Sequence, residues 1–159
     1  MPSSSQDRPP RWCHGRAAGF YTELEHPADL FLEIKGRDPA ELLEHALFAL
    51  FDQIVDLRTV RLVRRRTFSV READLTLALR HTLTEALALF NLEGFLAAAA
   101  GVRWEGGEGT VGVVVTLWGE NVDRSRHELQ TEIKAVTYHR LLTEQTEPGA
   151  WRATILFDV

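Results

Sequence analysis

The sequence has a single cysteine, no long apolar run and no excess of positive charge, and each absence excludes a class of protein. Cys13 has no second cysteine to pair with, so no intramolecular disulfide forms, which fits a reducing compartment. No stretch reaches the roughly 18 apolar residues of a membrane helix. Residues 1–18 hold proline, serine and arginine without the apolar segment of a secretory signal. We therefore expect a cytoplasmic protein with no membrane segment.

The formal net charge of -5 gives the chain no overall attraction to nucleic acid. The basic residues are spread out, except for the run Arg64-Arg65-Arg66. That run could contact phosphate, but a run of charges on an exposed strand that protects a sheet edge is the favoured interpretation. We expect no direct nucleic-acid binding.

Common nucleotide and zinc motifs are also missing. The only glycine cluster, Gly106-Gly107-Glu108-Gly109, fits a hairpin turn and does not follow a strand as a phosphate loop would. No cysteine and histidine spacing suits zinc. His81 and Glu85 lie four residues apart, which allows a metal or acid–base pair but favours an ordinary solvated pair on a helix.

The hydrophobic pattern predicts an α+β fold. Asp38 and Pro39 are typical of a helix start, and apolar residues continue at helical spacing to residue 55. Asp74 begins a second helix over 75–92, which Gly94 ends. Strands are expected at 20–24, 30–35, 60–70, 95–104, 111–118, 133–142 and 151–158. We expect residues 1–18 to be a disordered extension. Residues 19–159 should form one domain, with two helices on a mostly antiparallel, curled or two-layer sheet.

The C-terminal strand suggests half of a cation site. Ile155, Leu156 and Phe157 are apolar, so this end of the chain should be held in the core rather than frayed. The side chain of Asp158 and the α-carboxylate of Val159 then place two anionic groups one residue apart. Oxygen ligands of this kind suit a hard cation.

Two other segments carry polar residues that core packing does not require, Glu25 to Asp29 and Glu132 to His139. Lys134 stands between apolar residues and is costly to bury unless it meets a carboxylate, for which Asp29, Asp158 or the chain terminus could serve. The alternative is a lysine that extends along a solvated strand face. His26 could likewise be a simple loop histidine.

Four segments, taken in order, resemble the archease family: Glu25-His26-Pro27-Ala28-Asp29, Gly119-Glu120, Ile133-Lys134-Ala135-Val136-Thr137-Tyr138-His139 and Phe157-Asp158-Val159. Members typically begin with Glu-His-Thr-Ala-Asp, carry a strand like Val-Lys-Ala-Val-Thr-Tyr-His and end in Asp followed by an aliphatic residue. The resemblance covers about residues 20 to 159. The chain departs from it at Pro27, where threonine is usual, and at Arg80-His81-Thr82, where the second helix often has a tryptophan.

The resemblance implies a protein cofactor rather than an enzyme. Archease-like proteins activate the RtcB-type RNA-splicing ligase of tRNA splicing and RNA repair, promoting its guanylylation by GTP and its multiple turnover. The implied metal ligands are Asp29, Asp158 and Val159, with Lys134 as an important neighbour. Glu25, His26 and His139 are further candidates for the partner site. Two aspartates and an α-carboxylate suit Ca²⁺, Mg²⁺ or Mn²⁺.

Two other functions are alternatives to this one. A small metal-dependent hydrolase or phosphotransferase could use Asp29, Asp158 and Lys134 alone, but only His26 and His139 offer an acid or base. A chaperone-like or nucleic-acid-binding module is disfavoured by the negative charge and the lack of a basic aromatic platform.

Overall fold

The computed structural model describes residues 9–12, 19–26 and 28–159. The elements in chain order are β1 (Tyr21–Leu24), β2 (Leu30–Gly36), α2 (Pro39–Ile54), the 3₁₀ helix η2 (Leu57–Thr59), β3 (Arg64–Glu72), α3 (Leu75–Glu93), β4 (Phe95–Gly106), β5 (Val111–Asn121), β6 (Ala135–Val136), β7 (Leu142–Glu147) and β8 (Ala150–Asp158). The fold is α+β, as the hydrophobic pattern predicts. None of the helices in the described residues is both long and apolar enough to cross a membrane.

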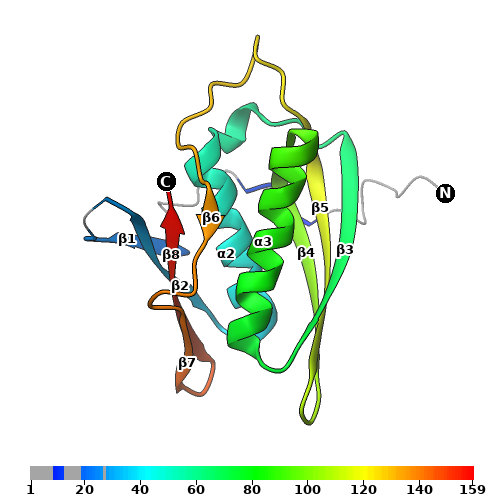
Figure 1. Ribbon diagram of the computed structural model, residues 1–159. Coiled ribbons are helices and arrows are strands. Elements are labelled where there is room, and N and C mark those ends of the chain that lie inside the picture. The colour runs from blue at the N-terminus through cyan, green and yellow to red at the C-terminus, as the bar shows by residue number, and fades with distance from the viewer. Residues whose placement is uncertain (1–8, 13–18, 27) are drawn as a thin grey trace, which may run out of the picture.

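The strands form two antiparallel sheets with the helices between them (Figure 1). One sheet has the order β1-β2-β8-β6, and β7 pairs with the same strand β8. The other has the order β3-β5-β4. Helix α2 packs on β2 and β4, while α3 packs on β3, β5 and β6. The two-layer form of the expected sheet is therefore the one adopted.

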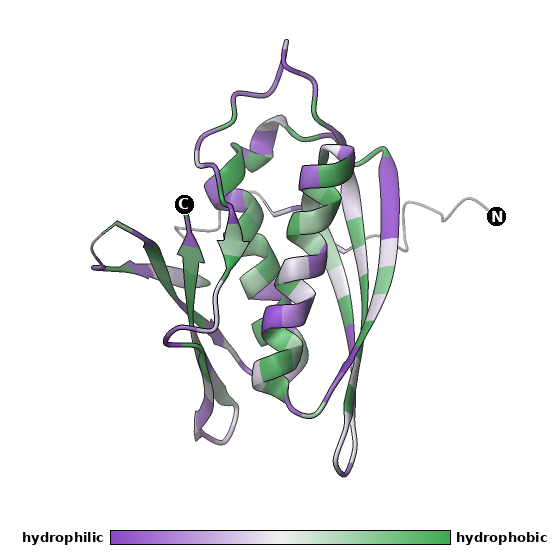
Figure 2. Ribbon diagram, viewed as in Figure 1, coloured by the Kyte–Doolittle hydropathy of each residue, from purple (hydrophilic) through white to green (hydrophobic). Residues whose placement is uncertain are grey.

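Local sequence signals account for both helices. The carboxylate of Asp38 accepts a hydrogen bond from the backbone N–H of Glu41 at 2.8 Å, and that of Asp74 accepts one from Leu77 at 2.9 Å. Gly94 ends α3 with φ of 70°, a left-handed value that glycine adopts without strain. The apolar side chains of α2 are buried on nearly every side, because a sheet lies on each side of the helix. Figure 2 shows hydrophobic residues concentrated on α2 and β8.

The arginine run lies on an edge strand, as expected. Arg64, Arg65 and Arg66 begin β3, which pairs only with β5 and forms one edge of its sheet. Figure 2 shows this end of β3 as strongly hydrophilic. Arg66 is engaged within the protein, because its Nε lies 3.2 Å from Glu93 and its guanidinium lies over the ring of Phe95. The charges therefore protect an open edge.

The expected strand over 133–142 is wrong in its extent. Only Ala135–Val136 pairs with the end of β8, and a turn follows before β7 pairs with the earlier part of the same strand. Arg140 adopts φ of 57°, a left-handed value that breaks strand geometry. The hydroxyl of Thr154 donates to the carbonyl of Arg140 at 2.7 Å and holds this turn against β8.

Trp12 departs from the expectation of a disordered N-terminal extension. Its side chain is 4% exposed and meets the ring of Phe48 edge-on at 5.5 Å. Its backbone N–H donates to the carbonyl of Ala98 on β4 at 2.8 Å. The adjacent Arg11 donates from its guanidinium to the carbonyl oxygens of Leu57 and Val60. Residues 9–12 are thus packed on the domain, and the remainder of the extension, with Cys13, lies outside the described residues.

Replacing Trp12 by alanine should destabilise the domain substantially. Truncation of a large buried aromatic side chain costs about 3 kcal/mol, since it removes apolar burial and leaves a cavity. The free energy of unfolding from urea titration measures the effect. Leu92→Ala is the matched control, because Leu92 is 85% exposed and its truncation should change stability by less than about 0.5 kcal/mol. Equal effects from the two variants would show that Trp12 is not anchored in the core.

Candidate functional site

The backbone positions of three expected site residues lie at one end of the first sheet, where β2 begins and β8 ends. In the antiparallel pair β2–β8, Leu30 stands opposite Phe157. Asp29 directly precedes Leu30 and Asp158 directly follows Phe157, so both aspartates adjoin the last residue pair of this ladder. On the other edge of β8, Ala135 stands opposite Asp158. The backbone therefore brings Asp29, Asp158 and Lys134 to one end of the sheet, beside the C-terminus (Figure 1).

Lys134 is attached to this end through its backbone rather than its side chain. Its N–H donates to the carbonyl of Asp158 at 2.8 Å. The side chain is exposed, and its ammonium makes no ion pair with any carboxylate in the described part of the chain. Of the two alternatives that the sequence left open, the solvated lysine describes this arrangement. The charge of Lys134 is then available to a ligand or partner.

Two histidines lie at the same end of the sheet as Asp29 and Asp158. Nδ1 of His26 is 3.6 Å from Oδ2 of Asp29, and the ring centroids of His26 and His139 are 6.3 Å apart. His26 also meets the ring of Phe31 edge-on. Glu25, His26 and Asp29 line an open hollow of about 790 Å³ together with Glu23 and Leu24. Four of the residues expected to form the site are therefore close neighbours: Glu25, His26, Asp29 and His139.

The backbone is strained beside two of the candidate site residues. Ala28, immediately before Asp29, has φ of 68°, and Arg140, immediately after His139, has φ of 57°. A left-handed conformation costs a residue with a Cβ about 1 kcal/mol. Such strain persists where the surrounding structure enforces it, and it is common at functional sites. Here each strained residue is the immediate neighbour of a candidate site residue.

The oxygen donors of the expected cation site suit a hard cation. Within residues 9–12, 19–26 and 28–159, no three histidine, cysteine, aspartate or glutamate side chains gather closely enough to hold an ion by themselves. The expected set has only two side-chain carboxylates, Asp29 and Asp158, and its third ligand is the α-carboxylate of Val159. All of its donors are oxygens, which suits Ca²⁺, Mg²⁺ or Mn²⁺.

Gly119 and Glu120 have structural roles that sequence reasoning did not assign. A Cβ on Gly119 would lie 1.8 Å from the carbonyl oxygen of Leu96, so only glycine fits beside the irregular pairing of β4 at Ala97. Oε2 of Glu120 accepts hydrogen bonds from the backbone N–H of Arg61 at 2.7 Å and from Nη1 of Arg126 at 3.1 Å. The charged side chain is 8% exposed.

His127 completes this network. Its Nδ1 accepts a hydrogen bond from the backbone N–H of Asp123 at 2.9 Å, so the ring proton is on Nε2. Nε2 donates to Oε2 of Glu120 at 3.1 Å. The network fixes the start of the segment that leads to Lys134, and Gln130 continues the attachment by donating from its N–H to the carbonyl of Ile54. The segment between β5 and β6 is therefore anchored at several points.

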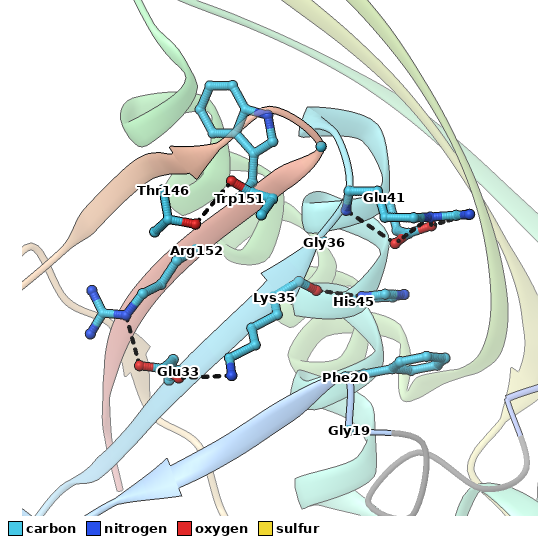
Figure 3. A pocket seen from close by; sticks show the side chains of 13 residues that line it. Gly19, Phe20, Glu33, Lys35, Gly36, Glu41, His45, Thr146, Trp151 and Arg152 are labelled. Carbon is cyan, nitrogen blue, oxygen red and sulfur yellow. Dashed lines mark hydrogen bonds and ion pairs between the residues drawn. The ribbon is translucent and has the colours of Figure 1, made fainter.

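A second hollow, of about 600 Å³, lies at the far end of β2 and β8 (Figure 3). It contains none of the expected site residues. The ring of His45 stacks on Phe20 at 3.9 Å and its Nδ1 bonds to the carbonyl of Lys35. Glu33 accepts from Arg152 at 2.7 Å, as Figure 3 shows. The hydrogen-bonding groups around this hollow bind one another, so it offers few groups to a ligand.

Comparison with known proteins gives a consistent result. The model of the Archease protein family matches residues 21–159. "Protein archease" of Thermococcus gammatolerans is 34% identical over 139 residues, which cover 87% of this chain and 98% of that protein. "Protein archease" of Methanosarcina barkeri is 30% identical over 142 residues, with coverage of 87% and 95%. The solution structure of Methanobacterium thermoautotrophicum protein 1598 superimposes with a TM-score of 0.77 at 25% identity, covering 88% of this chain and 99% of that one.

Glu120→Gln should destabilise the protein in a pH-dependent way. Burial tends to raise the pKa of Glu120, but the hydrogen bonds from Arg126 and Arg61 and the charge of Arg126 outweigh it, so the net pKa is lowered. A lowered folded-state pKa contributes stability above the unfolded value of about 4.3, and this stability is lost as the pH falls through the folded pKa. The variant should lose about 2 kcal/mol at pH 7.

The measurement is urea unfolding of both proteins from pH 7 down to pH 3. The difference between wild type and Glu120→Gln should shrink as the pH falls from the unfolded value of about 4.3 through the lowered folded pKa, because the wild-type carboxylate then becomes neutral as well. Glu108→Gln, in the exposed β4–β5 turn, is the control and should be neutral. A difference that stays constant with pH would contradict the charge-based role of Glu120.

Proposed function

The chain belongs to the archease family, and from this we propose that it is a non-catalytic protein cofactor of an RtcB-type RNA-splicing ligase. In this role it promotes guanylylation of the ligase by GTP and sustains multiple turnover in tRNA splicing or RNA repair. The role belongs in the cytoplasm, which agrees with the lone cysteine. The partner is the ligase protein, and no direct contact with RNA is needed.

The register of β2 on β8 is the observation that carries the proposal. The pair Leu30 and Phe157 adjoins Asp29 and Asp158, although 128 residues separate these two aspartates in sequence. Val159 adds an α-carboxylate one residue further on. Strand ends held by a buried core have little freedom, which favours a site whose ligands need little rearrangement when a cation binds. This supports a cation site made of Asp29, Asp158 and Val159.

Each residue has a distinct part in the proposed site. Asp29, Asp158 and the chain terminus hold the cation, with Ca²⁺, Mg²⁺ and Mn²⁺ all suited to these donors. A bound divalent cation supplies a compact positive charge that can hold phosphate oxygens. Lys134 offsets part of the local negative charge and can meet an anionic group of the partner. The acidic end as a whole complements a basic, metal-dependent ligase site.

The contact between His26 and Asp29 favours one other candidate function. A histidine 3.6 Å from a carboxylate is a recurring acid–base arrangement, so a metal-dependent hydrolase or phosphotransferase that acts alone is the alternative. That enzyme would release phosphate from a nucleotide or RNA without any ligase present. Turnover by the isolated protein, lost in His26→Gln, would favour the alternative over the cofactor role.

Asp158→Asn should abolish most of the activating effect while the fold is retained. The amide keeps the size of the side chain but removes a charge that a hard cation requires. In a multiple-turnover ligation assay with the ligase and GTP, stimulation should fall at least tenfold. Glu147→Gln, at the exposed β7–β8 turn, serves as the charge-matched control and should retain full stimulation. Undiminished stimulation by folded Asp158→Asn would contradict the proposal.

Extending the chain beyond Val159 should weaken cation binding even though every side chain is intact. Three added residues convert the α-carboxylate into a peptide group and move the terminal charge away. Calorimetric titration with Ca²⁺ and with Mn²⁺ should show at least a tenfold loss of affinity. Val159→Ala keeps the α-carboxylate and should bind within twofold of wild type. If the extended chain binds as tightly as Val159→Ala, the terminus is not a ligand.

A further inference from the structure

Arg80 of α3 contacts the segment that carries Lys134 and His139. Its Nε donates to the carbonyl of Val136 at 3.0 Å, and its Nη1 donates to the hydroxyl of Tyr138 at 2.9 Å. The centre of the guanidinium also lies 3.7 Å from the centroid of the Tyr138 ring. The side chain of Arg80 thus binds both the backbone and an aromatic ring of this segment.

The segment around Val136 has only a short backbone pairing with the sheet. Strand β6 is only two residues long. Besides its pairing with Asp158 and Phe157, the segment bonds to β8 from the N–H of Lys134 to Asp158, and from the N–H and hydroxyl of Thr137 to the carbonyl of Leu156 at 3.1 and 2.9 Å. Since N–H and C=O groups alternate in direction along a strand, the carbonyl of Val136 points away from β8. Arg80 supplies a hydrogen bond on that outer side, where the sheet supplies none.

The side chain of Tyr138 is 64% exposed despite this contact. One ring face lies on the guanidinium, an arrangement worth about 1 kcal/mol at a surface site. Lysine could not replace these contacts, because a point charge lacks the planar fork that donates two hydrogen bonds in fixed directions. The arginine therefore holds an exposed ring at the position directly before His139.

We propose that Arg80 is a positioning residue for the site at the end of β8. By holding Val136 and Tyr138, it fixes the segment that presents Lys134 on one side and His139 on the other. Its effect on the ligase rests on the proposed function, whereas its effect on the segment does not. Arg80 itself touches neither the expected cation ligands nor a substrate.

Amide hydrogen exchange followed by NMR tests the structural half without any ligase. In Arg80→Ala, exchange at Lys134 and Thr137 should accelerate at least tenfold, while the amides of the β2–β8 ladder stay within twofold of wild type. Arg80→Lys should be intermediate, as it keeps the charge over the ring but not both hydrogen bonds. Arg65→Ala, an exposed arginine of β3, is the control and should match wild type. Unchanged exchange in Arg80→Ala would overturn the proposal.

Tyr138→Phe tests the same contact through the acceptor of the hydrogen bond, since it removes only the hydroxyl that accepts from Arg80. It should accelerate exchange at Thr137 at least twofold with no change in the thermal unfolding midpoint. This variant also decides the matter if Arg80→Ala does not fold. Exchange identical to wild type in Tyr138→Phe and in Arg80→Lys would then count against the proposal.

The ligation assay tests the functional half. Arg80→Ala should raise the concentration of this protein needed for half-maximal stimulation at least fivefold, and Arg80→Lys should recover part of that loss. If wild type itself gives no stimulation, the proposed function fails, while the exchange data still decide the role of Arg80. If wild type stimulates, and Arg80→Ala loosens the segment but stimulates equally well, Arg80 does not serve the site.

Discussion

The pairing of β8 with β2 is the constraint on which the rest of the structure depends. Strand β8 bonds to β2 along one edge and to β6 and β7 along the other, and its Ile155 and Phe157 are fully buried against the helices. Because side chains alternate along a strand, a slip of one residue would turn these two away from the helices and turn Asp158 towards them. The same apolar contacts that stabilise the fold thus set the position of Asp158 at the end of β8.

A second level of organisation comes from charged and polar groups that hold irregular chain in place. The buried carboxylate of Glu120 collects hydrogen bonds from Arg61, Arg126 and His127, and Arg80 supports the short strand β6. Neither contact adds much apolar burial. Both act on the chain between β5 and β7, where backbone pairing is sparse, so electrostatics orders the part of the molecule that packing leaves loose.

Local signals made much of the fold predictable. Caps at Asp38 and Asp74 and a glycine at position 94 define both helices from a few neighbouring residues. A cation site that joins Asp29 and Asp158 stays a prediction that rests on the family resemblance, because no local pattern links residues so far apart. Trp12 and Arg80 could not be foreseen: each is bound by distant partners, Ala98 for one and Val136 for the other. The expected strand at 133–142 failed because an arginine adopted a left-handed conformation.

The attachment of Trp12 has a consequence for the behaviour of the protein at high concentration. Strand β4 is the outer strand of its sheet and includes a run of four small alanines, Ala97 to Ala100. Such a strand could pair with a copy from another molecule, and the hydrogen bond from Trp12 to Ala98 occupies part of the edge where that would begin. With arginines along β3 on the opposite edge, both edge strands of this sheet carry features that oppose pairing with another molecule.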